Sequence, residues 1–228
     1  AYEDGEAPAL ATTESGLPVL VWSQRVGGGT ELRGSHPAVG GGWENAYEVV
    51  SSANNPRQPA LAPATDDVLV LVWTETKAGE WAGSVPSSHV LHSPLAVSDM
   101  LLPVVGDYVV HPGSERDADQ AWPTVHVSKP NNEIRIFVAW QDDRDARAPS
   151  ADSEDRNIYF AEMLAGDAMF GLDYAVKYNV AARQERPAMT TRSPLHDDPV
   201  VLWISTAFGS EDVAGAGSNY FSLRLTNT

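Results

Sequence analysis

The feature that most constrains the fold of this 228-residue chain is an internal repeat that occurs four times. Each copy pairs a short segment that opens on proline with an apolar segment that ends on tryptophan. The prolines are Pro8, Pro59, Pro123 and Pro187, and the tryptophans are Trp22, Trp73, Trp140 and Trp203. Repetition at this spacing indicates that one supersecondary unit is used several times. The structure of that unit therefore determines the fold of the chain.

Each unit has the pattern of antiparallel strands. A proline is tolerated at the start of a strand, where its missing N–H costs little. The second segment is a nearly continuous apolar run, as in Val68–Trp73, which indicates a strand buried on both faces. No segment keeps a helical apolar period over three turns. We therefore predict an all-β, β-propeller-like fold of four repeated antiparallel sheet units, the last of them incomplete.

The boundaries of these units follow from the repeat. We expect a single domain over residues 1–228, with units of approximately 1–55, 56–118, 119–183 and 184–228. Third strands are expected at residues 89–92, 157–160 and 219–223, and in the first unit at 30–33 or 45–48. Fourth strands are expected at residues 47–51, 104–110 and 174–180.

Composition excludes several functions. The formal net charge of −16 repels phosphate groups, so we expect no nucleic-acid partner. No apolar run reaches the length of a membrane helix, so we expect no membrane insertion. The absence of cysteine excludes disulfides and thiolate catalysis. The chain opens on Ala1, which fits either removal of a signal peptide or a trimmed start. We expect an extracytoplasmic location, whether periplasmic, cell-surface or secreted.

The third unit resembles the repeats of sialidase-like, BNR-type β-propellers. The residues that carry the resemblance are Trp122–Val127, Ile136–Arg144 and Asp155–Phe160. They read as a proline-initiated strand, an apolar strand ending in tryptophan, an Asp-x-Arg turn and an Asn-Ile-Tyr strand. The Ser-x-Asp-x-Gly-x-x-Trp turn of that family is not in the sequence. The resemblance implies a propeller fold and, through the family's activity, a carbohydrate-active hydrolase.

Two groups of residues are candidate metal ligands. The segment after Trp140 is rich in carboxylates, which suit calcium, and these are Asp142, Asp143, Asp145, Asp152, Glu154 and Asp155. The same segment also fits a solvated hairpin with ion pairs to its arginines. His89 and His92 have the spacing of some metal pairs. However, residues three apart on a strand point to opposite faces, which favours two unrelated histidines.

The tryptophans fall into two classes. The four repeat tryptophans are expected in the core. Trp43, Trp81 and Trp122 lie outside the repeat pattern, so we predict that they form a ligand-binding surface.

Our leading hypothesis from the sequence is a non-enzymatic binding or assembly module with a protein or carbohydrate ligand, and with calcium as a stabilising ion. Homo-oligomerisation and completion of the last blade by another chain are open. The alternatives are a sialidase- or glycosidase-like hydrolase and a metal-binding surface protein that uses histidines. The sequence singles out no catalytic residue.

Overall fold

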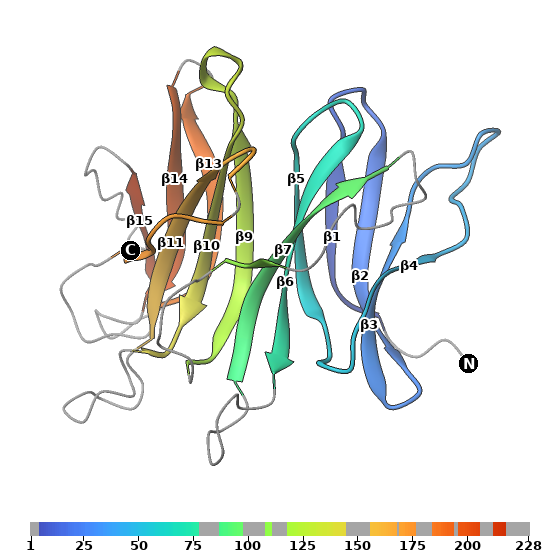
Figure 1. Ribbon diagram of the computed structural model, residues 1–228, viewed down its shortest axis with the longest axis horizontal. Helices are drawn as coiled ribbons and strands as arrows, with labels where there is room; N and C mark the ends of the chain where they lie inside the picture. The colour runs from blue at the N-terminus through green and yellow to red at the C-terminus, as the bar shows by residue number, and fades with distance from the viewer. Residues whose placement is uncertain are drawn as a thin grey trace. The chain divides into compact units, whose positions relative to one another are not determined.

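The computed structural model describes most of the chain as β-structure (Figure 1). The residues described are 5–77, 87–97, 108–110, 118–144, 156–167, 169–176, 184–193, 196–205 and 212–217. Within them, four antiparallel sheets follow one another in chain order, each with its strands in sequence order. Helical residues in these ranges are limited to a 3-10 turn at Pro130–Asn132 and a 3-10 position at Arg144.

The chain divides into two compact units, Ala1–Val109 and Val110–Thr228. Unit 1 holds two sheets. The strands of the first are β1 (Gly5–Thr12), β2 (Pro18–Val26), β3 (Gly29–Ser35) and β4 (Tyr47–Ser51). Those of the second are β5 (Arg57–Pro63), β6 (Val68–Lys77), β7 (Ser87–Ala96) and β8 (Tyr108–Val109). Apolar side chains of both sheets form one core, which includes Val19, Val21, Leu69, Leu71 and Trp73.

Unit 2 repeats this arrangement. The strands of its first sheet are β9 (Gln120–Ser128), β10 (Arg135–Asp142), β11 (Asn157–Leu164) and β12 (Tyr174–Ala175). Those of its second sheet are β13 (Gln184–Ser193), β14 (His196–Ser205) and β15 (Asp212–Gly217). Its core joins Ala139 and Ile158 of one sheet to Val201 and Trp203 of the other.

The fold predicted from the repeat is confirmed. In every sheet, the strand that contains the repeat proline pairs antiparallel with the strand that carries the repeat tryptophan. The proline does not open this strand as predicted, because it is the third or fourth residue of it. Trp73, Trp140 and Trp203 are buried as expected, whereas Trp22 is half-buried. The continuous apolar runs of β6 and β10 are buried at consecutive positions, which confirms burial on both strand faces.

The outer strands differ in part from the prediction. Both segments considered for the first unit are used, because residues 30–33 lie in β3 and residues 47–51 form β4. The described parts of the other two fourth strands are β8 and β12, each of two residues. In the last sheet the third strand is β15, at 212–217 and not at 219–223, which lies outside the described residues. The described part of that sheet has three strands.

We find no helix in the described ranges that is long and apolar enough to span a bilayer.

Candidate functional site

The first strand of every sheet is distorted at the same point. The residue directly before the repeat proline has a left-handed backbone in all four copies: Ala7 (φ 47°), Gln58 (φ 54°), Trp122 (φ 51°) and Arg186 (φ 51°). A residue with a Cβ rarely adopts this conformation, and a following proline restricts it further. Such strain costs about 1–3 kcal/mol per residue. Its presence in all four copies indicates that the geometry belongs to the unit itself.

The left-handed residue produces a β-bulge in each first strand. The pairing register shifts between Glu6 and Ala9, between Arg57 and Ala60, opposite Ala139 and Gln141, and between Glu185 and Ala188. We call these four places the first-strand bulges. Bulges change the direction of side chains and occur preferentially beside active sites. The first strands also lie at a sheet edge, and within each unit the two of them lie against each other.

In unit 2 the two first-strand bulges bring an aromatic ring and a cation together. The guanidinium carbon of Arg186 lies 5.0 Å from the ring centroid of Trp122. Trp122 is 38% exposed, and Arg186 is also exposed. This distance is within the range of a cation–π contact. The guanidinium lies over one face of the indole, so a flat ligand would stack on the opposite face.

Carboxylates flank this pair along the chain. Glu185, next to Arg186, forms an ion pair with Arg156, with Oε1 3.2 Å from Nη1. Asp119, three residues before Trp122, is exposed. Its backbone N–H donates to Oδ1 of Asp143 at 2.6 Å. Carboxylates of this kind can act as acids, bases or nucleophiles on a bound sugar.

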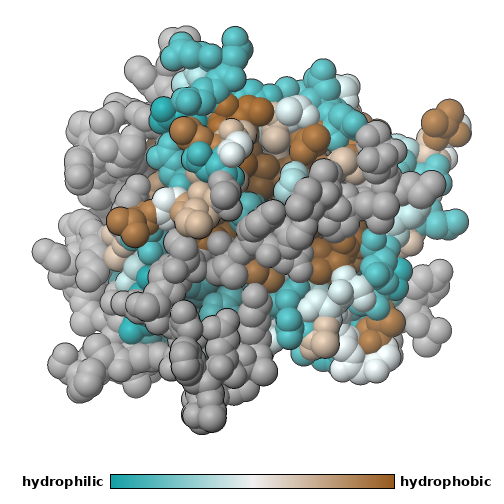
Figure 2. Space-filling view, viewed as in Figure 1, coloured by the Kyte–Doolittle hydropathy of each residue, from teal (hydrophilic) through white to brown (hydrophobic). Residues whose placement is uncertain are grey.

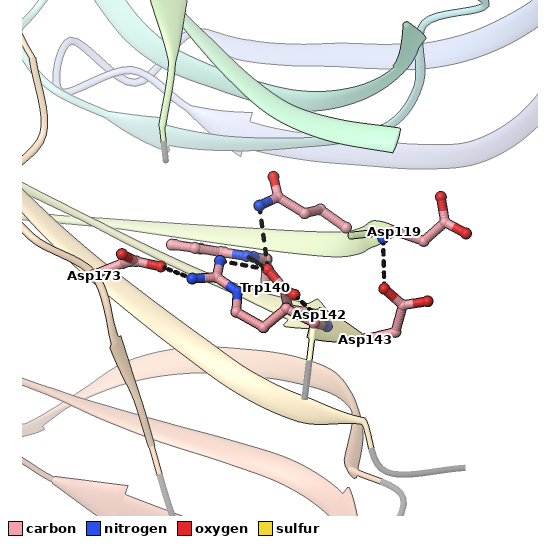
Figure 3. Close-up of polar contacts among 7 residues, drawn as sticks. Asp119, Trp140, Asp142, Asp143 and Asp173 are labelled. Carbon is pink, nitrogen blue, oxygen red and sulfur yellow. Dashed lines mark hydrogen bonds and ion pairs between the residues drawn. The ribbon is translucent and has the colours of Figure 1, made fainter. Parts of the chain in front are cut away.

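A buried polar network lies at the end of β10, near Asp119 (Figure 3). Oδ2 of Asp142 accepts hydrogen bonds from Nε1 of Trp140 at 3.0 Å, Nε2 of Gln120 at 3.2 Å and Nη2 of Arg144 at 2.6 Å. Oδ1 accepts the backbone N–H of Arg144 at 2.9 Å. Asp142 is fully buried. Its oxygens are engaged by protein donors, so we assign it a structural role.

Arg144 connects this network to the outer strand. Nη1 lies 2.6 Å from Oδ2 of Asp173, and the guanidinium stacks 3.8 Å from the ring centroid of Tyr159. Burial alone would lower the pKa of Arg144. The hydrogen bond and charge of Asp142, together with the charge of Asp173, outweigh burial and raise it. Arg144 therefore stays charged and links Asp142 of β10 to Asp173, the residue before β12.

Two of the six predicted calcium ligands, Asp142 and Asp143, lie within the described residues. Asp142 belongs to the buried network, and Asp143 receives the Asp119 N–H. Asp145, Asp152, Glu154 and Asp155 lie outside the described residues. Among the residues that are described, no group of three potential ligands is close enough to hold a metal. Calcium binding stays a prediction.

His89 and His92, the candidate ligands of the histidine-based metal site, both lie on β7, three residues apart. His89 is half-buried, and its Nε2 is 3.0 Å from Oγ of Ser87. His92 is buried, and burial lowers its pKa to about 4. A histidine-based metal site also stays a prediction.

Two of the three tryptophans of the predicted ligand-binding surface are described, one in each unit, and the surface stays a prediction. Trp122 lies at a first-strand bulge, whereas Trp43 lies in the loop between β3 and β4 and is 51% exposed. Trp81 lies outside the described residues. Sequence reasoning missed Arg186, Glu185 and Asp119. The repeat proline was the available signal, because the residues before it occupy the same distorted position in every unit.

The sequence matches no protein-family model and no curated protein. The fold, however, is similar to several solved structures. An α-L-arabinanase from Penicillium chrysogenum, complexed with arabinobiose, gives a TM-score of 0.68 at 12% identity, over 98% of this chain and 67% of that one. The GH93 α-L-arabinofuranosidase of Fusarium graminearum gives 0.65 at 14% identity, over 99% and 68%. An endo-arabinase from Bacteroides thetaiotaomicron gives 0.57 at 12% identity, over 100% and 85%.

These similarities support the β-propeller-like fold. The chain spans about two thirds of the length of the first two structures. The resemblance to sialidase-like repeats holds at the level of the propeller, since the structures named here are arabinan-degrading enzymes. The same finding corrects the leading hypothesis from the sequence. The three similar structures named above are glycosidases, so they speak against a non-enzymatic module and favour the hydrolase alternative.

Proposed function

We propose that this protein is a glycoside hydrolase whose sugar-binding site includes the two first-strand bulges of unit 2. The observation that carries the proposal is the contact between Trp122 and Arg186, with Glu185 adjacent in the chain. The fold supports the proposal as well, because similar solved structures are glycosidases.

In this proposal Trp122 is the stacking surface for a sugar ring. Its half-exposed ring provides apolar area for the C–H face of a sugar, while its contact with Arg186 fixes its orientation. Arg186 donates hydrogen bonds to sugar oxygens, because a guanidinium carries five N–H groups. A polar group at the edge of an apolar surface fixes the orientation of a bound ligand.

Hydrolysis of a glycosidic bond needs two carboxyl groups. One donates a proton to the leaving oxygen as the bond to the anomeric carbon breaks. The other either removes a proton from the attacking water or attacks the anomeric carbon itself, and water then completes the reaction. Glu185 and Asp119 are our candidates, since each precedes a first-strand bulge and neither belongs to the buried Asp142 network.

The proposed substrate is a neutral polysaccharide with arabinofuranosyl linkages. The net charge of −16 disfavours polyanionic chains. The arabinanase and the arabinofuranosidase with similar folds were both solved with arabinobiose. The carbohydrate partner predicted from the sequence is retained in this proposal, and an extracytoplasmic location stays a prediction.

The test is hydrolysis of arabinan and of p-nitrophenyl α-L-arabinofuranoside by the purified chain. Glu185→Gln should lower kcat by about 100-fold or more, because it removes an acid–base group. The matched control is Glu162→Gln, since Glu162 forms a comparable ion pair with Arg135 at 3.3 Å on β11. That control should keep the wild-type rate.

A second variant, Asp119→Asn, tests whether the other candidate carboxylate takes part in hydrolysis. Asp119 is exposed, so the substitution should leave the fold intact. Circular dichroism establishes that each variant is folded. Absence of hydrolysis by the wild-type protein on both substrates and on a wider glycoside panel would refute the proposal. Equal rates for Glu185→Gln, Asp119→Asn and Glu162→Gln would refute the assigned site.

A further inference from the structure

The loop between β3 and β4 has a fixed conformation that presents an exposed tryptophan. It covers residues 36–46 and extends beyond the strands of the first sheet (Figure 1). Trp43 pairs with Pro37 in an isolated β-bridge. Backbone N–H groups of Ala38 and Glu44 donate to the carbonyls of Gly42 and His36 at 3.0 and 2.9 Å. The loop is therefore a small hairpin.

Three consecutive glycines make the tip of this hairpin. Gly40, Gly41 and Gly42 have φ values of 113°, 101° and 82°. These values lie in the region that glycine adopts at no steric cost and that other residues adopt with strain. The tip conformation is thus encoded in the sequence Gly-Gly-Gly before Trp43.

The base of the hairpin is held by polar and aromatic contacts. The ring of His36 stacks on that of Tyr47 with centroids 5.9 Å apart, and its Nδ1 is 3.0 Å from the carbonyl of Pro37. Oγ of Ser35 donates to the carbonyl of Glu44 at 2.8 Å. These contacts connect the hairpin to both β3 and β4, so Trp43 projects from an ordered support.

The hairpin presents apolar groups to solvent. Trp43 is 51% exposed and Val39 is fully exposed. Figure 2 shows a hydrophobic spot at the right-hand edge, where Figure 1 places this loop. By contrast, Trp73 and Trp140 are fully buried. An ordered support under an exposed tryptophan is the arrangement expected of a binding contact, because little conformational freedom is lost on binding.

We propose that this hairpin is a second carbohydrate contact, which binds a neutral polysaccharide chain through Trp43. The inference rests on the proposed function, since a polymer substrate gives the protein a reason for contacts outside the bond-cleaving site. Trp43 supplies the stacking face, and exposed Glu48 and half-buried Glu44 supply acceptors for sugar hydroxyls. The net charge of −16 favours a neutral ligand over an acidic one.

The test separates polymer binding from bond cleavage. Affinity gel electrophoresis in soluble arabinan measures binding, and p-nitrophenyl α-L-arabinofuranoside measures cleavage of a substrate with a single sugar ring. Trp43→Ala should lose at least three-quarters of the wild-type retardation, while its kcat/KM on the small substrate stays within twofold of wild type. Trp43→Phe should restore most of the retardation, because it keeps an aromatic face.

Several outcomes would overturn the inference. One is wild-type retardation in Trp43→Ala, or no retardation of the wild-type protein. Another is a parallel loss of small-substrate cleavage in Trp43→Ala. Light scattering that shows Trp43-dependent dimers without polysaccharide would assign the hairpin to self-association instead. If the wild-type protein does not cleave the small substrate but is retarded through Trp43, the proposed function fails and the binding contact stands.

Discussion

The indole Nε1 of Trp140 donates a hydrogen bond to Oδ2 of Asp142 at 3.0 Å, and both residues are fully buried. The same relationship recurs in unit 1, where Nε1 of Trp73 donates to Oε1 of Glu75 at 3.1 Å. In both cases the acceptor is two residues after the repeat tryptophan. Two of the four copies therefore carry a buried polar contact as well as an apolar core residue, whereas Nε1 of Trp203 is buried without a hydrogen-bond partner among the described residues.

Loss of the Asp142 charge should destabilise unit 2. Asp142→Asn keeps the shape of the side chain but leaves buried Arg144 with Asp173 as its remaining ion-pair partner. We expect a fall of about 3 kcal/mol in the free energy of unfolding, measured in urea. The control is Asp143→Asn, because an amide oxygen can still accept the Asp119 N–H. The assignment of Asp142 as a structural anchor is wrong if both variants unfold at the same urea concentration.

Stability should fall with acid through His92. Burial lowers its pKa to about 4 in the folded protein, whereas the unfolded chain titrates near the usual 6.5. Between these values the unfolded state binds a proton that the folded state does not. Stability is therefore lost as the pH falls from 6.5 to 4, by about 3 kcal/mol in total.

His92→Gln removes this titration and should flatten the pH dependence of the melting temperature in that range. NMR titration of the imidazole in the folded protein gives the pKa directly. A pKa near 6.5, or an unchanged pH dependence in His92→Gln, would contradict the burial argument.

Glycine in the middle of a strand usually lowers stability, but at a first-strand bulge we expect it to leave stability unchanged or raise it. Ala7 has φ 47°, whereas Ala9, two residues on in β1, is paired with Val21. Ala7→Gly relieves strain, so we expect unchanged stability or a gain of up to about 1 kcal/mol. Ala9→Gly should lose about 1 kcal/mol. Thermal unfolding of the two variants compares them, and equal losses would argue against a strained backbone at Ala7.

Removal of the proposed stacking surface should weaken sugar binding. Trp122→Ala is expected to raise Kd for arabinobiose about tenfold, because stacked aromatic contacts contribute about 1–1.5 kcal/mol. Trp122→Phe keeps an aromatic face, so its Kd should lie between those of the wild type and Trp122→Ala. Isothermal titration calorimetry measures both, with the variants' melting temperatures as the folding control. Wild-type affinity in Trp122→Ala would exclude Trp122 from the site.

The proline–tryptophan repeat, as in Pro59 and Trp73, was sufficient to predict the sheets. The apolar run that ends in each tryptophan is too short for a membrane helix and has no helical period, so a buried strand is the structure it favours. The third strand of the last sheet could not be located in the same way. Asp212–Gly217 consists of small residues and glycine with one valine, so it has little strand propensity of its own, and pairing with β14 determines its structure.

The candidate site was harder to predict than the fold. A residue before proline is expected in an extended conformation, so nothing in the sequence predicted the left-handed backbone of Trp122 and Arg186. Their contact joins residues 64 positions apart in the chain, on two different sheets. Trp122 was selected because it lies outside the core pattern, whereas Arg186 and Glu185 are marked in the sequence by no more than their position before Pro187.

The most direct test of the proposed site is a crystal structure of the protein with arabinobiose bound. We expect a sugar ring stacked on Trp122, hydrogen-bonded to Arg186, with the carboxyl groups of Glu185 and Asp119 on either side of the glycosidic oxygen. Arabinobiose bound away from Trp122 and Arg186, with both carboxylates out of reach of the glycosidic bond, would contradict it.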